Sequence, residues 1–283
     1  MVDNLVPPRA RTSRVHRTAQ SAQHALTALK SASGSVWRFA LDFAVPHTCP
    51  SCGSLQQTEG GLCGPCWQRV PWIEDPVCDR LGLPLAYDLG PGAVSAEALA
   101  NPPQFDRLRS VCVHDGVAPK LVHALKFNGQ RHLALALGAM MARAGRAVLS
   151  KDNTVLVPVP LHTIRRVRRR YNQAGLLAEA ISRASSVQVT HTAVRRKRMT
   201  RQQVHLSRGE RIRNVRDAFE VTPRGKAELA GRHVVLVDDV HTTGATLNAL
   251  AWALKSQPAG STPAAVDALV FTTTLSPEHT DTI

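Results

Sequence analysis

Residues 234–247 read VVLVDDVHTTGATL, an apolar run that ends in two carboxylates and continues into a short loop of threonine and glycine. Four consecutive apolar residues are typical of a strand that is buried on both faces of a parallel sheet. Asp238 and Asp239 follow this run, and ligands of open α/β sheets bind at the carboxyl ends of the strands. We therefore expect two exposed carboxylates at the edge of a parallel α/β sheet.

The loop after the acid pair supplies hydroxyl groups and closely approachable backbone N–H groups at the start of a helix, from Thr242, Thr243, Gly244, Ala245 and Thr246. A phosphate fits such a helix N-terminus. The alternative interpretation is an ordinary buried strand and turn with a solvated acid pair, but adjacent acids followed by an anion loop have little packing purpose. This order of residues predicts a phosphosugar-binding site.

The stretch resembles the signature of type I phosphoribosyltransferases, which bind 5-phosphoribosyl-1-pyrophosphate. The resemblance implies a parallel sheet flanked by helices, with the acid pair Asp238 and Asp239 as the candidate catalytic residues on the ribose hydroxyls. It also implies a Mg²⁺ ion that bridges these hydroxyls and the pyrophosphate, with residues 242–246 around the 5′-phosphate. A dinucleotide-binding fold is disfavoured because no GxGxxG follows a strand anywhere in the chain.

A second loop of the same kind follows residues 154–158, which are predicted to form a strand. If both loops lie at one sheet edge, the turn that begins with Pro160 and Leu161 can hold the pyrophosphate. Lys126 stands at the end of a helical segment that Asn-Gly stops. It either caps the last carbonyls of that helix or faces the pyrophosphate, and the sequence leaves both interpretations open.

Composition predicts a globular protein with polyanionic partners. With 283 residues and 43% hydrophobic content, the chain can bury a packed core. The formal net charge of +14 is concentrated in two runs, which contain Arg165, Arg166, Arg168, Arg169 and Arg170, and Arg195, Arg196, Lys197, Arg198 and Arg201. Nucleic acid is therefore a candidate partner.

Two further features predict the cellular location. No apolar run approaches the roughly 20 residues that span a bilayer, and the first residues lack the apolar core of a secretion signal. Four of the six cysteines stand in CxxC pairs, which indicates metal binding in a reducing compartment rather than disulfides. We expect no membrane span and a cytoplasmic location.

The two CxxC pairs, Cys49 with Cys52 and Cys63 with Cys66, are separated by ten residues, so four thiolates can converge tetrahedrally on one zinc ion. Four thiolates leave no position for water, and the zinc is therefore expected to be structural and to supply folding energy. Cys78 is interpreted as a buried apolar thiol, with a neighbour of the metal site as the alternative.

These patterns divide the chain into three predicted parts. Residues 1–45 form a basic N-terminal extension, interpreted as a solvated tail or as an arm for nucleic acid or a membrane surface. Residues 46–86 form the zinc-binding module, and residues 87–283 form the phosphoribosyltransferase-like domain. Within that domain, residues 195–214 are too polar for a core and are interpreted as a charged lid over the sugar or as a nucleic-acid-contacting arm.

Taken in order, the motifs resemble the ComF family over roughly residues 40–275. They are the CxxC module, LKFxG at 125–129, VPVPL at 157–161, RYNQ at 170–173, TxxQxxLxxxxRxxN at 200–214 and VDDVxTTGAT at 237–246. The resemblance implies a zinc-containing, phosphoribosyltransferase-like protein associated with natural competence and DNA uptake. It adds as functional positions, for the lid or for nucleic acid, Arg170, Asn172, Gln173, Gln203, Arg211 and Asn214.

The chain departs from the ComF pattern at one cysteine pair, and the resemblance also implies binding partners. Many relatives carry a second CxxCG pair, whereas here Leu81 stands where the partner of Cys78 would be, so one zinc per chain is expected. Single-stranded DNA is the implied ligand besides the phosphosugar, and competence or recombination proteins are the implied partners.

Two functions from different classes therefore remain. One is a phosphoribosyltransferase that transfers a pentosyl group, with phosphoribosyl pyrophosphate as donor and no acceptor named by the sequence. The other is a non-catalytic single-stranded DNA-binding protein with the same fold. Because the aromatic content is only 4%, base-stacking platforms are not expected, and DNA binding would be dominated by phosphate contacts.

Overall fold

The computed structural model describes residues 48–56, 61–127, 132–161, 171–197 and 218–275. The chain divides into two units, Met1–His47 with Leu55–Gln57 and Thr48–Ser54 with Thr58–Ile283. The first unit lies almost wholly outside the described residues, so the description concerns the second. The basic extension, the first arginine run and most of the predicted lid also lie outside the described residues.

The second unit is built on a parallel five-stranded sheet with the order β1-β7-β6-β2-β3. Its strands are β1 (Leu108–Val113), β2 (Thr154–Pro158), β3 (Gln188–Val189), β6 (His233–His241) and β7 (Ala265–Thr273). All four pairings between neighbouring strands are parallel. The predicted parallel α/β sheet is confirmed.

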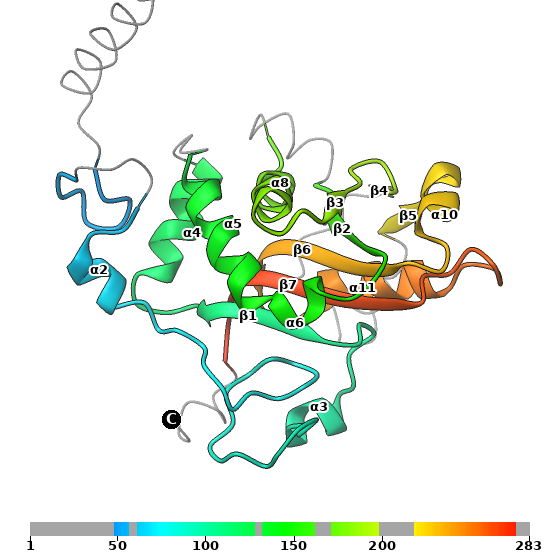
Figure 1. Cartoon of the computed structure of the whole chain (residues 1–283), viewed down its shortest axis with the longest axis horizontal. Coiled ribbons are helices and arrows are strands. Elements are labelled where there is room, and N and C mark those ends of the chain that lie inside the picture. The colour runs from blue at the N-terminus through cyan, green and yellow to red at the C-terminus, as the bar shows by residue number, and fades with distance from the viewer. Residues whose placement is uncertain (1–47, 57–60, 128–131, 162–170, 198–217, 276–283) are drawn as a thin grey trace, which may run out of the picture. The chain divides into compact units, whose positions relative to one another are not determined.

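Helices cover both faces of this sheet (Figure 1). One face carries α4 (Ala118–Phe127), α5 (Leu133–Ala144), α6 (Arg146–Leu149) and α8 (Gln173–Ser185), and the other carries α11 (Ala245–Lys255). On β6, Val234 and Leu236 pack on the α11 side, whereas Val235 and Val237 pack on the α5 and α8 side. This double burial is why the strand reads as an unbroken apolar run.

Shorter elements complete the described part of the unit. They are α2 (Gly64–Gln68), α3 (Ala96–Ala100), α10 (Pro223–Leu229), and an antiparallel ribbon of β4 (Val194–Arg196) and β5 (Phe219–Val221). No helix in the described ranges is both long and apolar enough to cross a bilayer.

The chain segment that follows α2 runs along the outer edge of β1. The Ile73 N–H donates to the Val111 carbonyl at 3.1 Å, and the Val113 N–H donates to the Pro71 carbonyl at 2.9 Å. An open parallel edge would otherwise expose unpaired backbone groups, and this segment covers part of it. The same contacts attach the cysteine-bearing segment to the sheet.

Candidate functional site

The acid pair lies inside β6 rather than after it, because the strand continues to His241. Although side chains alternate along a strand, the carboxyl groups of Asp238 and Asp239 are in hydrogen-bond contact with each other at the end of β6. Asp239 is only 9% exposed, and its carboxylate forms an ion pair with Lys126. Asp238 is half-buried. The expectation of two exposed carboxylates is therefore wrong for both acids, most clearly for Asp239, whose partner Lys126 comes from the helix that packs over the end of β6.

Lys126 belongs to the last turn of α4, which brings its ammonium group to the end of β6. Both side chains are largely withdrawn from solvent, with exposed fractions of 22% for Lys126 and 12% for Asp239. An ion pair of this kind is costly to break from one side, because the remaining charge stays partly buried. The structure thus joins two residues that the sequence predicts separately for the phosphosugar site.

Asp238 lies beside this ion pair and has a strongly perturbed carboxyl group. Burial raises the pKa of Asp238 well above its ordinary range, and the neighbouring Asp239 carboxylate raises it further. The Asp238 Oδ1 atom accepts the backbone N–H of Asp239 at 2.9 Å. The folded state therefore favours the protonated form of Asp238 more strongly than the unfolded chain does.

We expect Asp238→Asn to stabilise the protein at pH 8 by on the order of 1 kcal/mol. The folded-state pKa of Asp238 exceeds the unfolded value, so the wild type loses stability as pH rises from the ordinary carboxyl pKa through the raised one. The amide resembles the protonated carboxyl group and avoids this loss. Urea unfolding at pH 4 and pH 8 measures it, and the gain must be much smaller at pH 4, close to the ordinary carboxyl pKa, than at pH 8.

Asp152→Asn is the matched control for this prediction, because Asp152 is exposed at the start of the loop before β2. It removes the same charge from a solvated position and should leave the free energy of unfolding unchanged at both pH values. Equal effects of the two substitutions at pH 8 would show that net charge, and not the buried site, determines the change.

The loop after β6 has the form of an anion site. Thr242 and Thr243 are exposed, and no side chain within the described ranges caps the first turn of α11. Gly244 has φ of +67°, and a Cβ atom there would lie 2.8 Å from His241 Nε2, so this position requires glycine. The open N–H groups of a helix N-terminus then face the space beyond β6, where an anion is favoured.

The second predicted loop lies next to the first. Pro158 of β2 is in register with Val237 of β6, and the Val159 N–H donates to the Val237 carbonyl at 2.9 Å. Pro160 and Leu161 therefore leave the sheet beside the acid pair. The tertiary structure brings together the acid pair, both loops and Lys126, as the sequence predicts for one site.

Asn172 helps to fix that second loop. It precedes α8, and its Nδ2 group donates to the Val159 carbonyl at 3.1 Å. Gln173, the first residue of α8, is 2% exposed. Of the remaining positions that the ComF resemblance implies, Arg170, Gln203, Arg211 and Asn214 lie outside the described residues.

Two histidines that the sequence analysis missed also stand at this edge of the sheet. His114 follows β1, and its Nδ1 atom is 2.8 Å from Thr272 Oγ1. His241 ends β6, and its Nδ1 atom is 2.9 Å from Thr273 Oγ1. Burial lowers the pKa of His241 to about 4, and burial followed by the charge of Lys126 lowers that of His114. Both are therefore neutral at pH 7. Their only sequence signal is their position at strand ends.

The four predicted zinc ligands converge. The Sγ atoms of Cys49, Cys52, Cys63 and Cys66 all lie within 4.8 Å of one another. Cys52 Sγ and Cys63 Sγ are 3.6 Å apart, close to the about 3.8 Å that tetrahedral geometry requires when each Zn–S bond is about 2.3 Å. Four thiols in this arrangement fit a closed structural zinc site, and they leave no coordination position for a substrate.

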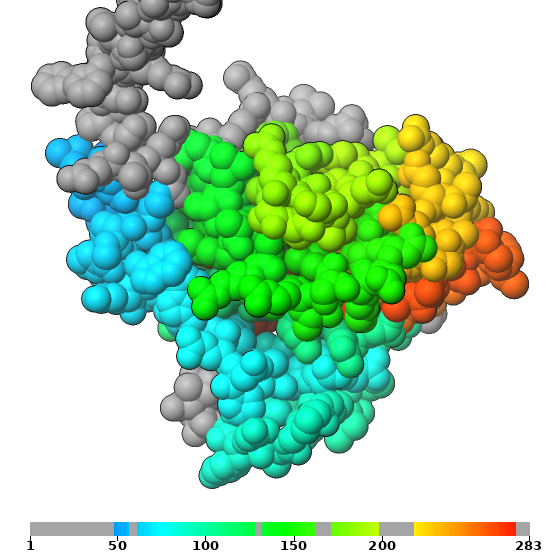
Figure 2. Space-filling model, in the orientation of Figure 1, coloured from blue at the N-terminus to red at the C-terminus, as the bar shows by residue number. Residues whose placement is uncertain are grey.

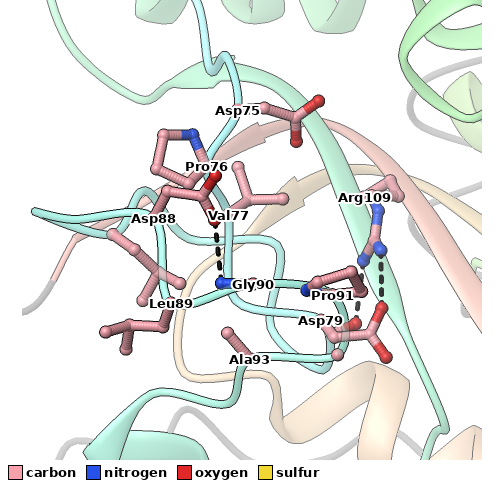
Figure 3. Close-up of a pocket in the computed structure, with 12 residues that line it drawn as sticks. Asp75, Pro76, Val77, Asp79, Asp88, Leu89, Gly90, Pro91, Ala93 and Arg109 are labelled. Carbon is pink, nitrogen blue, oxygen red and sulfur yellow. Dashed lines mark hydrogen bonds and ion pairs between the residues drawn. The ribbon is translucent and has the colours of Figure 1, made fainter.

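Cys78 is a buried thiol, as predicted. It is fully buried, and its Sγ atom accepts the N–H groups of Leu81 at 3.4 Å and Ser95 at 3.2 Å. Within the described ranges no second group of cysteines gathers around it. The surrounding loop instead forms a hollow of about 420 Å³ in which Asp79 binds Arg109 (Figure 3).

Comparison with known proteins agrees with these observations. Residues 40–98 match the model of the double zinc ribbon domain, and residues 138–266 match that of the phosphoribosyl transferase domain. The first match includes the four converging cysteines and also Cys78. Here the second half of the ribbon retains one cysteine, held by N–H donors and apolar packing.

Curated relatives extend the match to most of the chain. The DNA utilization protein YhgH of Escherichia coli K12 is 33% identical over 73% of this chain and 90% of its own length. Competence protein F of Haemophilus influenzae is 32% identical over 72% of this chain and 88% of its own length. Competence protein ComFC of Bacillus subtilis is 31% identical over 50% of this chain and 54% of its own length. The chain therefore belongs to the ComF family of zinc-ribbon, phosphoribosyltransferase-like proteins.

Proposed function

We propose that the protein binds phosphoribosyl pyrophosphate at the edge formed by β6, β2 and α11, and acts in natural competence and DNA uptake. The observation that carries the ligand assignment is the adjacency of the two loops beside the acid pair, since Pro158 is in register with Val237. The names of the relatives, competence proteins and DNA utilization proteins, support the cellular role.

In this proposal each part of the edge binds one part of the ligand. Asp238 and Asp239 hold the ribose hydroxyls, while residues 242–246 hold the 5′-phosphate at the N-terminus of α11. Pro160 and Leu161 approach the pyrophosphate, and Lys126 offers it a positive charge. The donor set of two carboxylates beside a diphosphate suits Mg²⁺, which neutralises the phosphate charge when it is bound.

The chemistry that such a site supports is pentosyl transfer, in which an acceptor forms a bond to C1 of the ribose as the bond to pyrophosphate breaks. Fixed donors around the departing pyrophosphate stabilise the charge that develops on it. The six cysteines form no disulfide, which fits the cytoplasm as the proposed place of action.

Isothermal titration calorimetry of the full chain with phosphoribosyl pyrophosphate and Mg²⁺ tests the proposal. We expect saturable binding of one ligand per chain. Ribose 5-phosphate and pyrophosphate alone should each bind more weakly, because each engages only one of the two loops. Absence of heat with all three ligands, in protein that retains its zinc, would contradict the assignment.

Single-stranded DNA binding is the second candidate function, and the net charge of +14 together with the names of the relatives favours it. Among the described members of the two basic runs, Arg195 and Lys197 have largely exposed side chains but share Glu220. The DNA contacts are therefore assigned mainly to the run Arg165–Arg170, which lies outside the described residues.

We expect the affinity for a single-stranded oligonucleotide to fall steeply with salt. Each phosphate that an arginine neutralises contributes roughly −0.7 to the log–log slope, so glutamine at Arg165 and Arg166 should flatten it by about that amount per lost contact. Fluorescence anisotropy at several salt concentrations measures the slope. Arg224→Gln with Lys226→Gln on α10 is the charge-matched control. A slope equal to that of the wild type would assign the arginines to another role.

A further inference from the structure

A cavity of about 920 Å³ lies between the segment that follows the zinc ligands and helices α5 and α6. Figure 2 shows this hollow between the cyan segment and the green helices. None of the residues that line it belongs to the candidate phosphosugar site. Arg146 and Ser150, on its α6 wall, precede β2 and therefore lie toward the amino ends of the strands, whereas the acid pair lies toward their carboxyl ends.

Two tryptophans form one wall of the cavity. Trp67 and Trp72 have ring centroids 4.6 Å apart with their planes tilted by 51°. Trp67 is 44% exposed, which is a large fraction for an indole that belongs to a folded module. An exposed indole that a second ring holds in place offers a rigid π-face at low conformational cost.

The opposite wall carries positive charge that the protein does not neutralise. Arg143 of α5 and Arg146 of α6 line the cavity and are exposed, and neither forms an ion pair with another residue of the described ranges. Arg109 also lines it, but Asp79 binds its guanidinium group (Figure 3). Free guanidinium groups beside an aromatic wall suit a phosphate attached to a planar ring system.

Three further polar side chains line the cavity. Glu74 and Asp75 are exposed on its rim without an ion pair within the described ranges, and the Ser110 hydroxyl is buried with no hydrogen-bond partner there. Carboxylates accept amino and imino hydrogens, which nucleobases carry on their edges. They also disfavour a ligand that consists of phosphate alone.

We propose that this cavity is a second ligand site that binds a nucleotide, with its base against Trp67 and its phosphate near Arg143 and Arg146. The volume lies in the range of roughly 300–1,000 Å³ that is usual for small-molecule sites. A free nucleotide and one nucleotide of a single strand share this chemistry. The proposal is independent of phosphosugar binding, because the two sites share no residue.

Quenching of tryptophan fluorescence tests the proposal on the full, zinc-loaded chain. Adenosine 5′-monophosphate, a ten-residue oligodeoxyadenylate and an abasic strand of equal length are the probes. We expect quenching by the first two at much lower concentration than by the abasic strand. Saturation by the monophosphate identifies a free-nucleotide site, and saturation by the oligonucleotide alone identifies a strand site. Equal affinity for the abasic strand would overturn the proposal.

Variants locate the binding. Trp67→Leu should weaken nucleotide binding about tenfold, as expected for one stacked base. Arg143→Gln with Arg146→Gln should also weaken it, whereas the charge-matched pair Arg224→Gln with Lys226→Gln should not. Ala147→Glu, on the exposed wall of α6, blocks the cavity without touching the zinc module. Wild-type affinity in the tryptophan, arginine and alanine variants would overturn the proposal.

A last variant separates this site from the phosphosugar site. Asp238→Asn with Asp239→Asn should retain nucleotide quenching while it loses phosphoribosyl pyrophosphate binding. Loss of both activities in a variant that is still folded and contains zinc would show that the nucleotide binds at the β6 edge instead. If the wild type bound the nucleotide but did not bind phosphoribosyl pyrophosphate, the phosphosugar proposal would fail and the cavity proposal would stand.

Discussion

We expect the double variant Asp238→Asn with Asp239→Asn to bind phosphoribosyl pyrophosphate at least about 100-fold more weakly than the wild type. Each charge-assisted hydrogen bond from a carboxylate to a ribose hydroxyl contributes about 1.5–3 kcal/mol, and the amides lose the charge from both. Calorimetry with Mg²⁺ measures the change. Asp88→Asn with Asp152→Asn removes the same charge from exposed positions and should bind normally.

The ion pair of Lys126 with Asp239 complicates this experiment, and the design must account for it. Asp239→Asn leaves the Lys126 ammonium group without its partner in a position that is only 22% exposed, so stability falls as well. Adding Lys126→Met removes the orphaned charge and should recover most of that stability without recovering ligand binding. If the affinity returned with the stability, the carboxylates would be structural and the site assignment would be wrong.

Zinc removal should have an even larger effect on structure. We expect about one zinc per chain, and we expect Cys49→Ser or Cys66→Ser to lose it, since both thiols are buried among the four converging ligands. In zinc-finger peptides the metal contributes about 10–16 kcal/mol, so residues 48–56 and 61–70 should unfold without it. Elemental analysis and hydrogen exchange of that segment measure the two effects.

Cys78→Ser is the matched control for the zinc experiment. Its thiol lies apart from the four ligands and is held by the N–H groups of Leu81 and Ser95. The variant should keep one zinc per chain. Two zinc ions in the wild type, or loss of the metal only in Cys78→Ser, would show that the second half of the ribbon does bind metal.

Local signals were strong enough to predict several parts of this protein. The apolar run 234–237 needs both of its faces covered, and it forms the central part of β6 between α11 on one side and α5 with α8 on the other. Residues 154–158 likewise form a buried strand, β2. The two CxxC pairs predict their own convergence, because one tetrahedral ion admits few arrangements of four thiolates.

Contacts between segments far apart in the chain could not be predicted from the sequence. The apolar run predicts where a strand begins, but its register against β7 carries β6 on to His241 and places the acids within it. Lys126 meets Asp239 only because α4 packs on the face to which Asp239 projects. His114 and His241 lie at the same sheet edge only because the order β1-β7-β6 aligns the ends of their strands.

The cavity lined by Trp67 and Trp72 also depends on contacts that the sequence alone does not predict. An aromatic content of 4% predicts few stacking platforms, because composition gives the number of aromatic residues but not which of them come together in the fold. The segment along β1 instead sets Trp72 against Trp67, and α5 and α6 add two arginines that no local pattern connects to them. Periodicity and motif spacing act through neighbours in the chain, so the sequence determined the central strands β2 and β6 and the convergence of the four cysteines. Packing acts through neighbours in space, so only the tertiary structure decided which of these groups share a site.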